Sequence, residues 1–176
     1  MNNSDVRELY SKLPSWFDWP IDQSKFEKMT QSILDENLNE LKKFLRNNSE
    51  EWRKVGLFVC CKTSKKQLMM DLKEDIETFQ VFFESSCLAS NNELLRYFHS
   101  FGVSRESFQE GFLCACASGS VETFRFFESS LDPVLVNKGF LFACASGNKE
   151  LVDLLILNGK SKRINKILFK NKKKKL

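Results

Sequence analysis

Two nearly identical stretches, GFLCACASG at Gly111–Gly119 and GFLFACASG at Gly139–Gly147, determine the fold expected for this chain. They differ only at their fourth letter and lie 28 residues apart. Internal repeats with periods of about 20–50 residues are typical of solenoids, in which each unit buries its apolar side against its neighbours. A chain of 176 residues has the length of one domain or of one short repeat array.

The same pattern fits the chain five times without an internal gap. With the first Gly of the motif as position 1, the copies start at Met29, Gly56, Phe82, Gly111 and Gly139. Position 6 then holds Leu34, Cys61, Cys87, Cys116 and Cys144. Position 9 holds Asn37, Ser64, Ser90, Gly119 and Gly147. The last two copies match most closely, and the first matches least.

Each copy is predicted to form two helices. In the fourth copy, apolar residues recur at the i, i+4, i+7 and i+8 spacing of one helix face: Phe108, Phe112, Ala115 and Cys116. A small or polar residue near position 9 then ends this first helix. In the fifth copy, Asp132 and Pro133 are expected to open the first helix as N-cap and first helical residue. Asn158 and Gly159 are expected to close the second helix.

Four of the six cysteines occupy position 6, which favours core packing over disulfides or metal binding. Equivalent positions of stacked hairpins lie on the order of 10 Å apart, whereas a disulfide needs Cα atoms within about 7 Å. No C-x₂-C pair is present. Cys60 and Cys114 fall outside this register, and Cys114 is the candidate for an exposed, reactive thiol. We expect reduced thiols and neither a metal nor a cofactor.

The stretch ACASGNKELVDLLILNG (Ala143–Gly159) resembles the core of an ankyrin repeat, and ACASGSVETFRFF (Ala115–Phe127) fits the same frame. LASNNELLRYFHSFG (Leu88–Gly102) fits it more loosely. The resemblance implies an all-α solenoid of stacked helix-turn-helix repeats, four to five in number, over residues 29–159. It also implies noncatalytic binding of another protein, as in effector and viral proteins that act on a host protein inside cells.

Two features depart from the ankyrin pattern. The Thr-Pro-Leu-His segment is replaced by Glu110-Gly111-Phe112-Leu113 and by Lys138-Gly139-Phe140-Leu141. The repeat is also about five residues shorter than the usual 33. Too few residues therefore remain for projecting β-hairpin fingers, and a compact array is expected.

The charge of the chain is divided unevenly. Residues 160–176 hold nine Lys or Arg and no acid, whereas the first 159 hold 18 basic and 23 acidic residues. One interpretation of this segment is a cap, through Ile164, Ile167 and Leu168, followed by a solvated tail. The other is contact with an import receptor or an anionic surface through Lys172, Lys173, Lys174 and Lys175. Specific DNA recognition is not expected, because no recognition element accompanies the tail.

The N-terminal residues 1–28 are expected to cap the array. Their stretch LPSWFDWP (Leu13–Pro20) packs aromatic residues between two prolines; the alternative is a docking element for a partner. No secretory signal or apolar run of about 20 residues is found. We therefore expect a cytoplasmic protein, in the host cytosol if it is an effector or viral protein, or a nuclear one.

Catalytic patterns are missing from the sequence. It has neither a phosphate-binding GxxxxGK[ST] loop nor a GxGxxG motif. The only histidine, His99, is expected to be an ordinary residue on a helix surface. We therefore expect no enzyme, with one alternative: an enzyme or regulator whose site lies in the divergent first 80 residues.

The candidate partner-binding surface consists of positions 0 and 4 of each copy, which are expected to point away from the buried face. These positions vary in chemistry on a constant frame, and several are apolar where water is expected. The candidates are Val55, Val59, Val81, Glu110, Cys114, Lys138 and Phe142. The alternative is that terminal segments fold over them. Lys28, Ser32 and Ser85 occupy the same positions.

Overall fold

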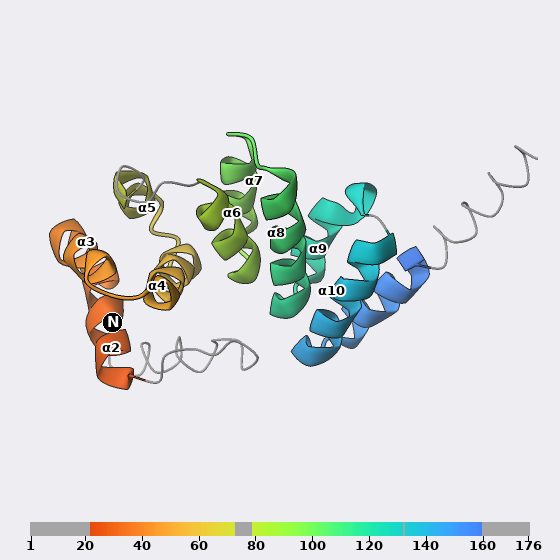
Figure 1. The fold of residues 1–176 in the computed structure, drawn as a ribbon, viewed down its shortest axis with the longest axis horizontal. Helices are drawn as coiled ribbons and strands as arrows, with labels where there is room; N and C mark the ends of the chain where they lie inside the picture. The colour runs from red at the N-terminus through yellow and green to blue at the C-terminus, as the bar shows by residue number, and fades with distance from the viewer. Residues whose placement is uncertain (1–21, 73–78, 132, 160–176) are drawn as a thin grey trace, which may run out of the picture.

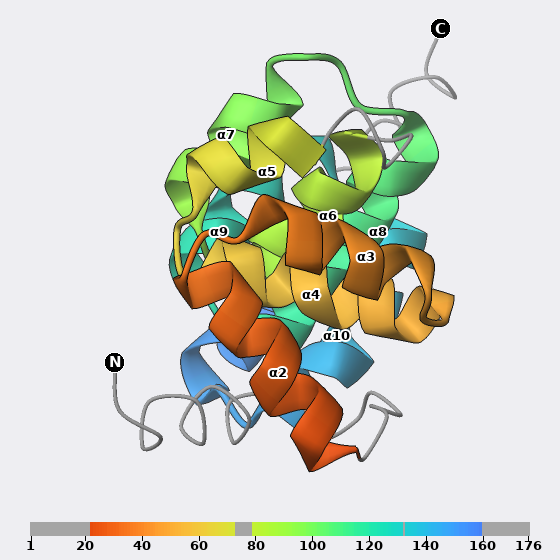
Figure 2. The ribbon, with the colours of Figure 1, turned by 90° about the vertical axis from the view of Figure 1, so that its left-hand side faces the viewer.

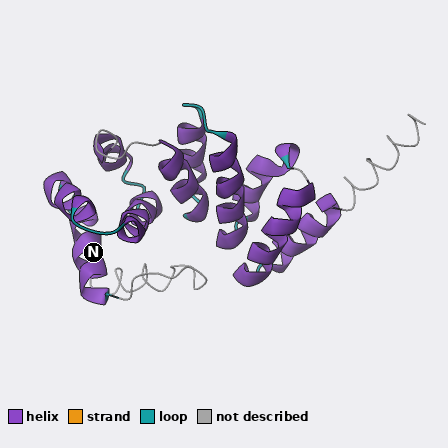
Figure 3. Ribbon diagram, in the orientation of Figure 1, coloured by secondary structure: helices purple, strands orange, loops and turns teal. Residues whose placement is uncertain are grey.

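The computed structural model describes residues 22–72, 79–131 and 133–159. Within these ranges the chain forms helices joined by short loops, and it contains no strand (Figure 3). The all-α part of the prediction is therefore confirmed for the described residues. The predicted aromatic cap, Asp132 and the basic tail lie outside them.

Helices alternate between a first and a second member of five hairpins. The first helices are α2 (Gln23–Leu34), α4 (Glu50–Lys62), α6 (Phe79–Leu88), α8 (Arg105–Ser118) and α10 (Pro133–Ser146). The second helices are α3 (Leu38–Arg46), α5 (Lys66–Leu72), α7 (Asn92–His99), α9 (Val121–Phe127) with the 3₁₀ turn η1 (Glu128–Ser130), and the helical residues 149–159. Since α2 begins at Gln23, the hairpins start before the expected boundary at residue 29.

The hairpins follow one another in chain order along the long axis of the molecule (Figure 1). Each first helix contacts the first helix of the next hairpin, from α2 through α4, α6 and α8 to α10. Viewed from the end of the molecule, α2 lies in front and the later hairpins lie behind it (Figure 2). We call the contact between two neighbouring first helices a seam.

A left-handed residue joins the two helices of every hairpin. Positive φ angles occur at Glu36, Ser64, Ser90, Gly119 and Gly147. In the fourth and fifth hairpins the residue is Gly, which adopts this conformation without the steric cost that a Cβ adds. The predicted position 9 is therefore confirmed in hairpins two to five.

The first copy was predicted one residue too late. Its left-handed residue is Glu36 rather than Asn37, and Asn37 instead caps α3 by accepting a hydrogen bond from the backbone N–H of Glu40. Position 1 of this hairpin is thus Lys28, and position 6 is the buried Ile33 rather than Leu34. This copy has neither Gly at position 1 or 9 nor Cys at position 6 to fix the register.

Asparagines that follow the left-handed residue also link one hairpin to the previous one. Asn148 accepts from the N–H of Leu151 and donates through Nδ2 to the carbonyl of Gly119 at 2.7 Å. Asn91 caps α7 in the same way and donates to the carbonyl of Cys61 at 2.8 Å. Local helix capping and the spacing between hairpins therefore depend on the same side chains.

The seams around α8 repeat one packing arrangement. A Cβ added to Gly111 would lie 2.5 Å from the ring of Phe83 and 3.2 Å from Cys87 Sγ. A Cβ added to Gly139 would lie 2.5 Å from the ring of Phe112. Both rings are fully buried. Position 1 must therefore be Gly at these seams, because no other residue leaves room for the ring of the preceding hairpin.

The cysteines at position 6 fill the same seams. Cys61, Cys87 and Cys116 are completely buried, as predicted, and Cys60 is buried as well. None of the six cysteines forms a disulfide. The prediction is wrong for Cys144, which is exposed, because the described residues contain no further first helix to cover this position of α10.

The predicted start of α10 is confirmed, and the left-handed conformation expected at Gly159 is not observed. Pro133 is the first residue of α10. Gly159 does not end the last helix in a left-handed conformation, because residues 149–159 are helical throughout and only Gly102, Gly119 and Gly147 have positive φ among the described glycines. The Asn158 side chain instead donates to Glu128 of the preceding hairpin at 3.0 Å.

Substituting Gly139→Ala should lower the free energy of unfolding by about 1–3 kcal/mol, because the new methyl group forces the buried Phe112 ring out of position. Gly159→Ala is the matched control, since its Cβ would lie 3.7 Å from Val136 in ordinary contact and Ala favours a helix. Urea unfolding followed by circular dichroism measures both changes. Equal stability of the two variants would show that the seam does not require glycine.

Candidate functional site

The candidate site is the face that the first helices α6, α8 and α10 turn away from their second helices. Among the predicted residues, Glu110 and Lys138 are exposed, and Val81, Cys114 and Phe142 are half-buried. These five side chains come from three consecutive first helices. We call this surface, together with Glu84, the first-helix face.

Val55 and Val59 do not belong to this surface, and their prediction as exposed residues was wrong. Both are buried, within a run of seven consecutive buried residues from Val55 to Cys61 that covers nearly two turns of α4. This part of α4 has no solvent-facing side. Neither valine is accessible to a partner in this structure.

Position 4 is less exposed than the sequence predicted. Ser85 is buried at position 4, and Cys114 and Phe142 are half-buried there. Ser32, which the corrected register places at position 5, is buried, and Lys28, now position 1, is exposed. Position 4 follows position 1 by three residues, so the two occupy adjoining parts of the helix surface. Because position 1 packs into the seam, position 4 lies at its border and is partly covered.

Glu84 is a residue of the face that the sequence analysis missed. It lies on α6 at position 3, between Lys54 of α4 and Glu110 of α8. Burial raises the pKa of the Glu84 carboxyl above its usual value, and the negative charge of Glu110 raises it further. Hydrogen bonding with Ser107 and the positive charge of Lys54 act in the opposite direction. The sequence offered one sign of this role: Glu84 is an acidic residue two positions after position 1 of its copy.

Ser107 also fixes the seam beside Glu84. Its hydroxyl donates to Gln80 Oε1 at 3.1 Å, which joins α8 to α6 next to the carboxylates. The first-helix face therefore lies on two helices whose relative position is set by a side-chain hydrogen bond as well as by packing.

Cys114 is a poor candidate for a reactive thiol. Burial raises its pKa to about 12, and the carboxylates of Glu84 and Glu110 contribute in the same direction. The nucleophile in thiol chemistry is the thiolate, which a raised pKa suppresses. Cys114 is half-buried rather than exposed, and the two acids beside its thiol oppose its ionisation.

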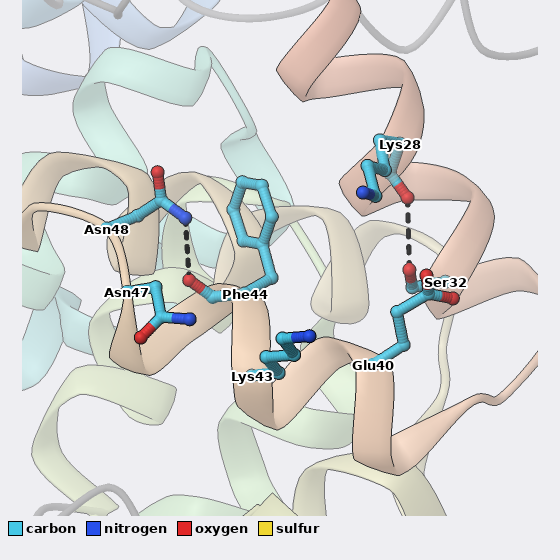
Figure 4. Close-up of a pocket in the computed structure, with 7 residues that line it drawn as sticks. All are labelled: Lys28, Ser32, Glu40, Lys43, Phe44, Asn47 and Asn48. Atoms are coloured by element: carbon cyan, nitrogen blue, oxygen red, sulfur yellow. Dashed lines mark hydrogen bonds between the residues drawn. The ribbon is translucent and has the colours of Figure 1, made fainter.

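A hollow of about 210 Å³ opens between α2 and α3. Figure 4 shows Lys28 and Ser32 on α2 facing Glu40, Lys43 and Phe44 on α3. Two of the lining polar side chains are engaged in local bonds: the Ser32 hydroxyl donates to the carbonyl of Lys28, and Asn48 Nδ2 donates to the carbonyl of Phe44. These two side chains are therefore used in helix-end and intrahelical contacts rather than presented to the hollow.

His99 lies at the end of α7 and is exposed, as predicted. Its ring packs edge-on against Phe126, with 5.0 Å between centroids, and also lies near Phe83 and Phe108. Its neighbours in this cluster are aromatic rather than nucleophilic. Among the described residues, no group of three or more His, Cys, Asp or Glu side chains is placed to hold a metal ion.

No family model, curated protein or solved structure matches this chain. In the described part of the chain, no helix combines the length and the apolar character needed to cross a membrane. The evidence for the role of the first-helix face is thus its own geometry and chemistry.

Replacing Glu84 by Gln should stabilise the protein at neutral pH. A carboxyl with a raised folded-state pKa binds its proton more tightly in the folded state, so stability falls as pH rises from the unfolded value of about 4.3 through the folded value. Glu84→Gln removes this loss. We expect a gain below about 1 kcal/mol, because solvent screens the partly exposed carboxylate.

Thermal unfolding of both proteins between pH 3.5 and 8 measures the effect. The two melting temperatures should converge at the acidic end, where the Glu84 carboxyl is protonated in both folded and unfolded states. A difference that stays constant across this range would contradict the proposed electrostatic origin.

Proposed function

We propose that the chain is an ankyrin-like solenoid of helical hairpins that binds another protein through its first-helix face and carries out no catalysis itself. The observation that carries this proposal is the contrast between the seams and the face. The seams around α8 use the same residue types twice, whereas the face changes its chemistry from one hairpin to the next. Repeat proteins that bind other proteins show this division between a constant frame and a variable surface.

The repeated features of the hairpins include hydrogen bonds at the turn as well as buried side chains. The Ser118 hydroxyl donates to the carbonyl of Ala115 at 2.9 Å, and Ser146 donates to Ala143 at 2.8 Å. These bonds repeat the same turn in two hairpins. Because buried side chains and turn bonds hold each hairpin together, substitutions at exposed positions can change the surface without destabilising the fold.

The variable part combines charged and apolar groups. The face presents Val81 and Glu84 on α6, Glu110 on α8, and Lys138 with Phe142 on α10. Half-buried apolar side chains beside charges of both signs suit the centre and rim of a protein interface. The charges would select the partner and orient it more than they would add affinity.

Capture experiments with matched charge reversals test the proposal. The double variant Glu110→Lys/Lys138→Glu reverses two charges of the face. The control Glu122→Lys/Arg125→Glu reverses two exposed charges on α9, which belongs to the opposite layer. We expect the face variant to lose at least about tenfold in binding to the proteins that the unmodified chain captures, because mismatched interface charges cost several kcal/mol.

Both variants must keep their helical circular dichroism and melting temperature. Retained capture by the face variant would refute the first-helix face as the binding surface. Equal loss in the face variant and in the α9 control would likewise refute it, since binding would then not depend on this face in particular.

A further inference from the structure

The hollow between α2 and α3 lies in the first hairpin, at the other end of the array from α10 (Figure 1). One face of each helix lines it. Two lining residues lie four positions apart on α2, and the others follow the i, i+3, i+4 and i+7 spacing of one face along α3 and its C-cap: Lys28 and Ser32, then Glu40, Lys43, Phe44 and Asn47. Two helix faces therefore meet here without filling the space between them.

Two lysines bring positive charge to the hollow from its two sides. Figure 4 shows the side chains of Lys28 on α2 and Lys43 on α3 extending into the space between the helices. Neither ammonium group is hydrogen-bonded or ion-paired to another described residue. An ammonium group has three donors, so both lysines can form charge-assisted hydrogen bonds with an anion placed between them.

The charges of the lining residues fit an anion with a single negative charge. Two lysines against Glu40 leave a net charge of +1. The Glu40 carboxylate accepts a weak hydrogen bond of 3.4 Å from Asn37 Nδ2, and it stays exposed. A carboxylate carries one negative charge, whereas a phosphate group carries about −1.5 to −2 at neutral pH. Because Glu40 would repel the additional charge, the lining favours a carboxylate.

Phe44 gives the hollow an apolar wall. Its ring is half-buried and packs edge-on against the buried Trp52, with 5.8 Å between ring centroids. The hollow of about 210 Å³ is smaller than the roughly 300–1,000 Å³ of sites for drug-sized ligands. Its size therefore suits a group no larger than one side chain, with an apolar part that can lie against the ring.

We propose that this hollow binds a single carboxylate on a short apolar stem, with Lys28 and Lys43 pairing to the carboxylate and Phe44 contacting the stem. The carboxylate can belong to an acidic side chain of a protein or to a free small carboxylic acid, which share this chemistry. Ion pairs at exposed sites are weak, so the dissociation constant is expected to be on the order of 1 mM. The inference is independent of the first-helix face, since no residue of that face lines the hollow.

NMR titration of the full-length ¹⁵N-labelled chain tests the proposal at low ionic strength, where charges are little screened. The probes are 3-phenylpropanoate, as a free small acid, and N-acetylglutamate methylamide, as an acidic side chain within a protein. Their neutral counterparts, 3-phenylpropanamide and N-acetylglutamine methylamide, keep the shape and remove the charge. Inorganic phosphate is the competing anion.

The test variant is Lys28→Gln/Lys43→Gln. The matched control is Lys25→Gln/Lys42→Gln, which removes two positive charges from the same two helices at positions that do not line the hollow. Gln keeps helix propensity in both variants. Circular dichroism and the melting temperature verify that both are folded.

We expect a carboxylate probe to produce saturable shifts at the backbone amides of α2 and α3 around the hollow. Affinity should fall at least about tenfold in the test variant, because both charge-assisted contacts are lost, and should be unchanged in the control. Binding of the glutamate derivative would assign the carboxylate to a protein side chain. Binding of 3-phenylpropanoate alone would assign it to a free small acid.

The absence of saturable shifts with both carboxylates would overturn the proposal. Equal binding of the neutral counterparts would also overturn it, because the negative charge would then not be recognised. The same holds for equal loss of affinity in the test and control variants, since the effect would come from net charge and not from the two lining lysines. Tighter binding of inorganic phosphate than of either carboxylate would refute the assigned class of ligand.

Discussion

The structure depends on the close approach of neighbouring first helices at their glycines. The ring of Phe112 lies where a Cβ of residue 139 would be, and Phe83 stands in the same relation to Gly111. A missing side chain in one hairpin thus makes room for a large one in the hairpin before it. This fit buries the adjacent thiols, sets the distance between first helices, and thereby sets the spacing of the residues on the first-helix face.

At that spacing, charged side chains on neighbouring hairpins of the face are close enough to interact. The pKa of Glu84 on α6 responds to Lys54 on α4 and to Glu110 on α8, so charges from three consecutive hairpins act on one carboxyl. The same two acids help to keep the Cys114 thiol protonated. Seam packing and surface chemistry are therefore coupled: a shift of one first helix would change the charge environment on the next.

The hairpins and the buried position-6 thiols could be predicted from the sequence, because a repeated motif reports both the period and the residues that every copy buries. The burial of Val55 and Val59 could not. A repeat pattern says which side of a helix faces its neighbours in an average copy, whereas α4 is buried on every side between Val55 and Cys61. Glu84 was missed for a related reason, since its environment comes from two other hairpins at positions that the motif does not fix.

The two ends of the array differ in a way that follows from the direction of the seam. At the seams around α8, α6 and α8 each offer Phe at position 2 and Cys at position 6 to the hairpin after them, and α8 and α10 each offer Gly at position 1 to the hairpin before them. At the α2 end, the positions that would face a preceding hairpin include Ser24 and Lys28, which are polar and exposed. At the α10 end, Leu141 is exposed, and so is Cys144 although its equivalents Cys61, Cys87 and Cys116 are buried. Polar Ser24 and Lys28 are well solvated, whereas Leu141 and Cys144 leave apolar surface in contact with water, so the less favourable exposure lies at the α10 end of the described array.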